Sequence, residues 1–102
     1  MTWRIQIHPK ALAELEALAR ADQRRMAKAI DALADDPMRK RPGVDIKRIG
    51  ALPGRRSLCR IRVGKHRSLY AVVQADHEVV VLLIDDRGKG YGRMTKTAKE
   101  RA

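Results

Sequence analysis

Several features that mark other protein classes are missing from this chain of 102 residues. It has one cysteine, so it can form neither an internal disulfide framework nor a cysteine-rich zinc site, which suits a reducing compartment. The first ten residues hold no apolar stretch of the kind found in secretion signals, and no apolar run approaches the length of a membrane span. We therefore expect a cytoplasmic protein that makes no contact with a membrane.

Motifs for metal or nucleotide chemistry are missing as well. The three histidines are scattered, and there is no HxH pattern, no HExxH pattern and no carboxylate cluster. Asp85 and Asp86 are the one tempting acidic pair, but adjacent strand residues point to opposite faces and cannot easily share an ion. A Walker motif is absent, and Cys59 alternates with an arginine, which favours a core thiol over a nucleophile. We expect neither a metal nor a cofactor.

Acidic residues are scarce relative to basic ones. Lysine and arginine number 23 against 12 aspartates and glutamates, which gives a formal net charge of +11. A charge this high points to nucleic acid or to an acidic protein partner. The hydrophobic fraction of 44% argues against a disordered basic tail, and the length predicts one domain with a modest core.

The apolar pattern predicts an α+β domain in which an N-terminal strand and a helical hairpin precede a three- to four-stranded antiparallel sheet. Residues 3–7 alternate apolar and polar, which is typical of a half-buried strand. An amphipathic helix is expected over residues 11–20, with Pro9 suited to its first turn. A second helix is expected to begin at Asp22 as its N-cap and to end before Pro37. The remaining strands are expected at residues 45–49, 58–63, 66–74 and 78–85.

Arginines gather on the expected strands. Arg60 and Arg62 are two residues apart, so they share one strand face, with apolar neighbours on the other. Arg67 opens the next strand, and Arg87 follows the last strand, with Tyr91 just beyond. The planar guanidinium grips phosphate in bidentate fashion, so this set predicts a polyanion site. Metal-free cleavage of RNA through its own 2′-hydroxyl would need such cations, together with a base and an acid.

Four short patterns carry a family resemblance. They are W-x-I-x-x-H-P-K-A-L-x-E-L near the N-terminus, L-A-D-D-P after the second helix, R-I-R-V-G-K-H-R-x-L-Y, and V-V-V-L-L-I-x-x-R-x-x-x-Y. Together they resemble the RelE/ParE superfamily of toxins from type II toxin–antitoxin systems, over roughly residues 3–91. The resemblance implies a single toxin domain at residues 1–91 and a basic tail or short helix at residues 92–102. It also implies an acidic cognate antitoxin in a toxin–antitoxin hetero-oligomer.

RelE-like members of the superfamily enter the ribosomal A site and cut mRNA, so the resemblance implies a ribosome-dependent endoribonuclease, or mRNA interferase, that inhibits translation. Ribosome and mRNA are then the expected partners. Carried over by motif, the catalytic positions are Arg67, Arg87 and Tyr91. The expected RNA-binding positions are Arg60, Arg62, Lys65, His66 and Lys89.

The sequence departs from the RelE pattern at the general base. Both arginine positions of the R-I-R motif are often lysine in that pattern, and one of these lysines has been proposed as the base. A guanidinium does not give up its proton near neutrality, so Lys65, His66 or Tyr91 would have to take this role. His66 has the most suitable ordinary pKa, but it precedes Arg67 and should face away from it on a regular strand.

ParE-like members offer the alternative function. They share the scaffold, lack the ribonuclease residues and act on DNA gyrase, so this chain could inhibit gyrase by binding alone. The retained Arg67, Arg87 and Tyr91 favour the RelE-like function. Tyr91 could also be a packing residue that anchors the tail.

The other arginines have structural interpretations too. Arg60 and Arg62 could lie on the solvated face of an edge strand, where charge discourages aggregation. Arg67 could form an ion pair with Asp85 or Asp86 and have no catalytic part.

Overall fold

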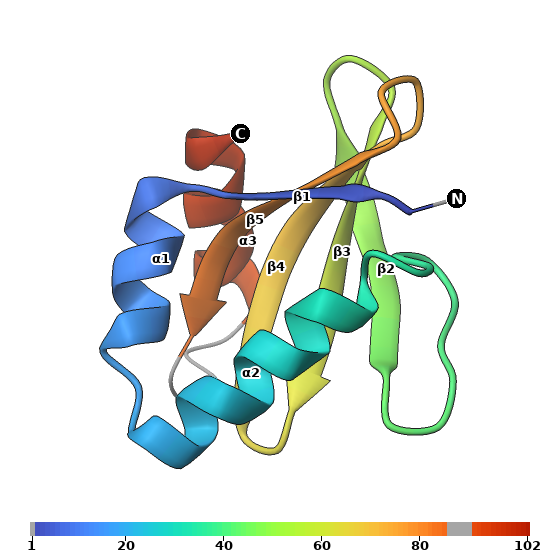
Figure 1. Ribbon diagram of the computed structural model, residues 1–102. Helices are drawn as coiled ribbons and strands as arrows, with labels where there is room; N and C mark the ends of the chain where they lie inside the picture. Colours follow the sequence, from blue (N-terminus) through green and yellow to red (C-terminus); the bar gives the residue numbers. More distant parts are fainter. Residues whose placement is uncertain (1, 86–90) are drawn as a thin grey trace.

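The computed structural model describes residues 2–85 and 91–102, and it confirms an α+β fold with the expected order of elements. Figure 1 shows a twisted sheet with helices on both of its faces. The elements are β1 (Arg4–Ile7), α1 (Pro9–Glu16), α2 (Arg20–Ala32), β2 (Asp45–Leu52), β3 (Arg56–Val63), β4 (His66–Val73), β5 (Glu78–Asp85) and α3 (Tyr91–Arg101).

The sheet has five strands in the order β1-β5-β4-β3-β2. Strands β2 to β5 form the expected antiparallel meander, joined by tight turns. The N-terminal strand adds a fifth strand, because β1 pairs in parallel with β5, from Arg4 opposite Glu78 to Ile7 opposite Val81. The meander therefore gains an edge strand from the other end of the chain. Strand β3 lies inside the sheet, although one interpretation of the sequence placed it at the edge.

Helices α1 and α2 cover one face of the sheet and enclose the larger core (Figure 1). The expected place of Pro9 in the first turn of α1 is confirmed, whereas the expected end of α1 and both expected ends of α2 were wrong by several residues. Helix α1 begins at Pro9, where the missing N–H costs nothing, and His8 caps it through Nδ1, which accepts from Lys10 N at 3.1 Å. Helix α2 begins at Arg20, so Asp22 lies in its first turn and is not the N-cap. Its carboxylate instead lies 3.2 Å from the imidazole of His66.

Two side chains with polar groups lie in this core, and one of them, Cys59, was predicted there from the sequence. Cys59 is fully buried, and burial raises the pKa of its thiol to about 11. Tyr70 is also fully buried, and its hydroxyl donates to the carbonyl of Pro37 at 2.6 Å. That hydrogen bond ties the loop after α2 to the middle of the sheet.

Helix α3 covers the other face of the sheet with a second, smaller core. Its apolar contribution comes from Met94 and Ala98, which pack on leucines of β2, β3, β4 and β5. The C-terminal residues therefore form a docked helix. The side chain of Arg101 does not lie on the solvated face of this helix, since it is only 14% exposed.

Arg101 takes part in a three-element contact, here called the Glu14–Arg101 clasp. Its guanidinium donates to both carboxylate oxygens of Glu14 at 2.8 and 2.9 Å, and to the carbonyl of Leu82 at 2.9 Å. Glu14 in turn accepts from Ile84 N at 3.0 Å. The pairing of β1 with β5 ends at Val81, so these two side chains satisfy backbone groups that lie beyond the end of β1. The clasp thereby joins α1, β5 and α3.

Candidate functional site

The sheet face that carries α3 changes from apolar to charged towards the β3–β4 turn. Four charged residues stand opposite one another on successive strands, in the order Asp45, Arg62, Arg67 and Asp85. We call this set the charged row. Its charges run minus, plus, plus, minus across β2, β3, β4 and β5. The strand alternation that places Leu69 against α3 also places Arg67 on that face.

The centre of the charged row suits a phosphate. Directly opposed residues of an antiparallel pair have Cβ atoms about 5 Å apart, so one phosphate can meet the guanidiniums of both Arg62 and Arg67. Like charges at this spacing repel each other, and the sheet places a carboxylate on the outer side of each arginine: Asp45 opposite Arg62 and Asp85 opposite Arg67. The position of Arg67 is therefore compatible with both interpretations: a structural residue beside Asp85, and a phosphate-binding residue beside Arg62.

Asp45 organises the cations at the β2 end of the row. Its Oδ2 accepts from Arg62 Nε at 3.0 Å and lies 3.0 Å from Arg62 Nη2. Its Oδ1 lies 3.3 Å from Arg60 Nη1 and 3.7 Å from Lys40 Nζ. Burial alone would raise the pKa of the Asp45 carboxyl, but the three cations outweigh burial and hold that pKa below its ordinary value. Asp45 is therefore ionised at neutral pH and fixes the direction of Arg62.

Arg60 and Arg62 share a strand face, as predicted, but they differ in exposure. Arg62 keeps 53% of its side chain exposed, whereas Arg60 keeps 9%. Arg60 is buried because β3 lies between β2 and β4, and its Nη1 also donates to the main-chain carbonyl of Asp45 at 3.2 Å. The interpretation of the pair as the solvated face of an edge strand was wrong. Arg60 is the buried partner of the Asp45 carboxylate, and Arg62 is the arginine of the pair that is accessible to solvent.

The β3–β4 turn places Lys65 and His66 on different surfaces. Lys65 is exposed. It follows Gly64, whose φ of +61° is a backbone conformation that residues other than glycine disfavour. His66 is only 3% exposed and lies on the α2 side of the sheet, with Nε2 3.2 Å from Asp22 Oδ2. It faces away from Arg67, as strand alternation predicts. This placement does not let His66 touch a ligand that lies over the charged row.

Three of the predicted site residues cannot be placed. Arg87 and Lys89 lie outside the described residues, and so does the side chain of Tyr91, although the Tyr91 backbone begins α3. The catalytic roles of Arg87 and Tyr91 stay predictions. Of the predicted catalytic set, the structure places the side chain of Arg67 alone.

Asp45 is a site residue that was not predicted from the sequence. It was treated only as the start of a short extended segment, and its role depends on the register that sets it opposite Arg62. An acidic residue near the start of an edge strand, with arginines two apart on the following strand, is the signal that could have suggested the contact.

Two features of residues 2–85 and 91–102 bear on other functions. They contain no group of three histidine, cysteine, aspartate or glutamate side chains that could hold a metal ion. None of the helices described there is long and apolar enough to cross a membrane.

Comparison with known proteins gives consistent matches. Residues 5–91 match the family described as ParE toxin of type II toxin-antitoxin system, parDE. The protein RelE1 of Methanocaldococcus jannaschii is 30% identical over 91 residues, which cover 89% of this chain and 97% of RelE1.

Solved structures match along most of the chain. RelE in the RelE–RelB complex of Pyrococcus horikoshii is 29% identical, with a TM-score of 0.76 over 88% of this chain and 100% of that one. A free mutant of Escherichia coli RelE matches with a TM-score of 0.66 at 17% identity, over the full length of both chains. The toxin–antitoxin complex RelBE2 of Mycobacterium tuberculosis matches with a TM-score of 0.63 at 18% identity, over 87% of this chain and 95% of that one. At these lower identities the similarity establishes the fold.

Proposed function

Because this chain belongs to the RelE/ParE superfamily of toxins from type II toxin–antitoxin systems, we propose that it is a metal-free, ribosome-dependent mRNA endoribonuclease that inhibits translation. The observation that carries the proposal is the pair of directly opposed arginines, Arg62 on β3 and Arg67 on β4, at the centre of the charged row. Sequence identity to the RelE of Pyrococcus horikoshii, at 29%, supports the RelE-like branch.

The charged row supplies the electrostatic part of the reaction. When the 2′-hydroxyl of RNA attacks the adjacent phosphate, negative charge builds up on the non-bridging oxygens of the phosphorane. Arg62 and Arg67 stabilise that charge with fixed, charge-assisted hydrogen bonds. Asp45 holds Arg62 in place before the RNA arrives, so less conformational entropy is lost on binding. In this proposal Arg60 acts through Asp45 and has no contact with the RNA.

Proton transfer belongs to other groups. A guanidinium cannot accept the 2′-hydroxyl proton near neutrality, and His66 is on the wrong face. Lys65 in the β3–β4 turn and Tyr91 at the start of α3 remain as candidates for the base. By resemblance, Arg87 contributes a third cation to the scissile phosphate.

Primer extension on mRNA from a translation extract tests the proposal. The Arg67→Ala variant should lower the cleavage rate by roughly 100-fold or more, the usual effect of removing one donor to a developing oxyanion. Arg4→Ala is the matched control, because Arg4 is an exposed arginine on β1, the strand at the opposite edge of the sheet from β2. Circular dichroism checks that both variants are folded. Cleavage by Arg67→Ala at the rate of the control would refute the proposed role of the row.

Inhibition of DNA gyrase is the second candidate, because the matching family is described by the ParE toxin. A supercoiling assay with purified gyrase separates the two functions. Under the first proposal the wild-type chain cuts mRNA in the translation extract and leaves supercoiling unchanged. Inhibited supercoiling without any cut in the mRNA would establish the ParE-like function instead.

The partner of this toxin is proposed to be an acidic cognate antitoxin in the cytoplasm. Solved relatives include complexes of RelE with the antitoxin RelB, among them the one from Pyrococcus horikoshii. The net charge of +11 favours a partner of opposite charge, which would bind faster through electrostatic steering.

A further inference from the structure

A second basic surface lies next to the β3–β4 turn, on the other side of that turn from the charged row. It is a groove of about 1140 Å³ between α2 and the loop that precedes β2. Cations from three separate parts of the chain line it, and we call it the basic groove. They are Arg25 and Lys28 of α2, Lys40 and Arg41 of the loop, and Arg62 of β3.

Most of these cations point into solvent. The exposed fraction of the side chain is 60% for Arg25, 72% for Lys40 and 53% for Arg62. Arg41 is different, because its guanidinium donates to main-chain carbonyls, including that of Ala32 at 2.8 Å, and so serves the end of α2. The groove thus has accessible cations and one arginine with a structural role.

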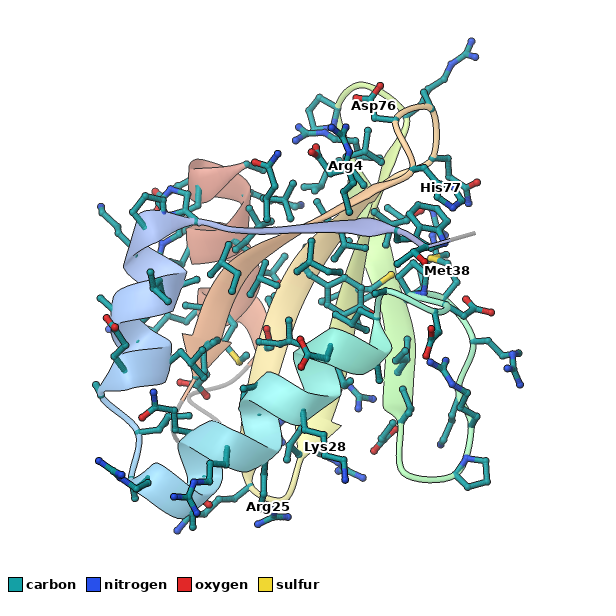
Figure 2. The ribbon with its side chains drawn as sticks, in the orientation of Figure 1. Arg4, Arg25, Lys28, Met38, Asp76 and His77 are labelled. Carbon is teal, nitrogen blue, oxygen red and sulfur yellow. The ribbon has the colours of Figure 1, made fainter. Side chains whose placement is uncertain are left out.

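The basic groove and the charged row are continuous. Arg62 and Asp45 belong to the row and also line the groove. Arg25 lies over the turn that separates the two surfaces, since its Nη2 is 3.3 Å from where a Cβ on Gly64 would stand. Figure 2 shows Arg25 and Lys28 on the part of α2 that lies beside the β3–β4 turn. A strand that leaves the charged row past Arg62 would therefore meet these side chains next.

Carboxylates in the groove and beside it do not cancel this charge. Asp45 is already contacted by three cations, and Asp22, the partner of Arg25, lies at a loose 3.8 Å while also facing His66. Asp31 and Asp35 also line the groove, further along α2 and the segment that follows it. The end of the groove next to the β3–β4 turn, with Arg25, Lys28 and Lys40, is therefore its basic end.

We propose that the basic end of the groove binds a second stretch of the same RNA strand whose scissile phosphate lies on the charged row. The inference rests on the proposed function and adds Arg25, Lys28 and Lys40 as RNA-backbone contacts. Exposed flexible cations suit phosphates, which they neutralise without reading sequence. Docking of an amphipathic helix is less favoured, because among the described residues the only large apolar side chain that is exposed is Leu12, on α1.

Salt dependence of RNA binding tests the inference. The probe is a fluorescein-labelled, 20-nucleotide single-stranded RNA with 2′-O-methyl groups, which lacks the attacking hydroxyl and so reports binding alone. Anisotropy titrations between 50 and 200 mM salt compare the wild type with the double variant Arg25→Gln/Lys28→Gln. Loss of two phosphate contacts should make the negative slope of log K for RNA association against log salt concentration shallower by about 1.4. This change corresponds to roughly 25-fold weaker binding at 0.1 M salt. A four-nucleotide probe, too short to span both surfaces, should show a much smaller change.

The control variant is Arg4→Gln/Arg39→Gln. These arginines are 68% and 67% exposed, each lies beside one carboxylate, and neither lines the groove, so the variant removes the same net charge elsewhere. Its slope should fall by far less than 1.4. Equal losses in the two double variants would overturn the inference, because a general charge effect would then explain both.

The remaining outcomes separate this inference from the proposed function. Groove-dependent RNA binding by a chain that cuts no mRNA would leave the basic groove as an RNA site and refute the nuclease. Cleavage by the wild type, combined with unchanged RNA binding in Arg25→Gln/Lys28→Gln, would refute the groove and leave the nuclease. Loss of binding to an acidic protein partner, with RNA binding unchanged, would reassign the groove to protein docking and overturn the inference.

Discussion

Replacing Arg101 by methionine should lower the free energy of unfolding by about 3 kcal/mol. The guanidinium makes three hydrogen bonds in the Glu14–Arg101 clasp, two to the carboxylate of Glu14 and one to the carbonyl of Leu82. Methionine keeps most of the aliphatic volume and removes all three. The backbone N–H of Ile84 keeps its bond to Glu14. The change therefore isolates the polar part of the contact that holds α3 to the rest of the fold.

The magnitude follows from the exposure of the two partners. Hydrogen bonds to charged groups contribute about 1.5–3 kcal/mol each, so three independent bonds would sum to more than is expected here. The Arg101 side chain is 14% exposed, but that of Glu14 is 31% exposed, so water can partly rehydrate the carboxylate once the arginine is gone. Removal of one partner from a fully buried pair costs about 3–5 kcal/mol, and the lower end of that range applies.

Urea denaturation of four chains measures the coupling directly. These are the wild type, Arg101→Met, Glu14→Gln and the double variant, which together form a double-mutant cycle. Glu14→Gln should cost less, about 1–2 kcal/mol, because the amide oxygen can still accept from the backbone. Lys99→Met is the control, since Lys99 is an exposed cation on the same helix, and its effect should lie within about 0.5 kcal/mol of zero. Equal stability of Arg101→Met and Lys99→Met would refute the energetic role of the clasp.

Three further predictions concern the core and the charged row. Tyr70→Phe leaves the buried carbonyl of Pro37 without its 2.6 Å hydrogen bond and should lower the free energy of unfolding by about 1–2 kcal/mol in urea; an unchanged midpoint would contradict this. Ionised Asp45 stabilises the fold fully above the ordinary pKa of 3.8, and this stabilisation is lost as the pH falls through the lower pKa of the folded state. In acid titrations, the difference in free energy of unfolding between the wild type and Asp45→Asn should therefore shrink below about pH 4. A gap independent of pH would count against that assignment. The Cys59 thiol, with its pKa raised to about 11 by burial, should resist iodoacetamide at pH 8 until urea is added, as mass spectrometry can check; rapid labelling of the folded chain would be inconsistent with its burial.

Local patterns were enough to predict much of the fold. The β-branched run of β5 and the turn at Gly64 gave β4 and β5 to within one residue, because both signals depend on neighbours in sequence. The prediction for β2 was poorer, since the strand runs to Leu52 and was expected to end at Ile49. Strand alternation also predicted the buried side of β3, where Cys59 lies, and the opposite directions of His66 and Arg67.

Long-range contacts were beyond the reach of such patterns. The parallel pairing of β1 with β5 depends on residues at opposite ends of the chain, and no local signal specifies it. The same limit explains Arg60, because an arginine two positions from another looks identical in sequence whether its strand lies at the edge or inside the sheet. The contact of Arg101 with Glu14 was beyond prediction for the same reason, because the two residues lie on different helices. The arginines of the candidate site and the neighbour of Arg67, Asp85, were named from the sequence, whereas Asp45, which holds Arg62, emerged only from the register.

The pairing of β1 with β5 also has a consequence for biosynthesis. Residues 4–7 leave the ribosome first, yet their hydrogen-bonding partners at residues 78–81 are made near the end of the chain. Two members of the charged row, Arg67 and Asp85, are likewise synthesised late. A nascent chain that stops before β5 has neither a complete sheet nor the complete charged row, so the candidate site can form only after nearly all of the chain has been synthesised.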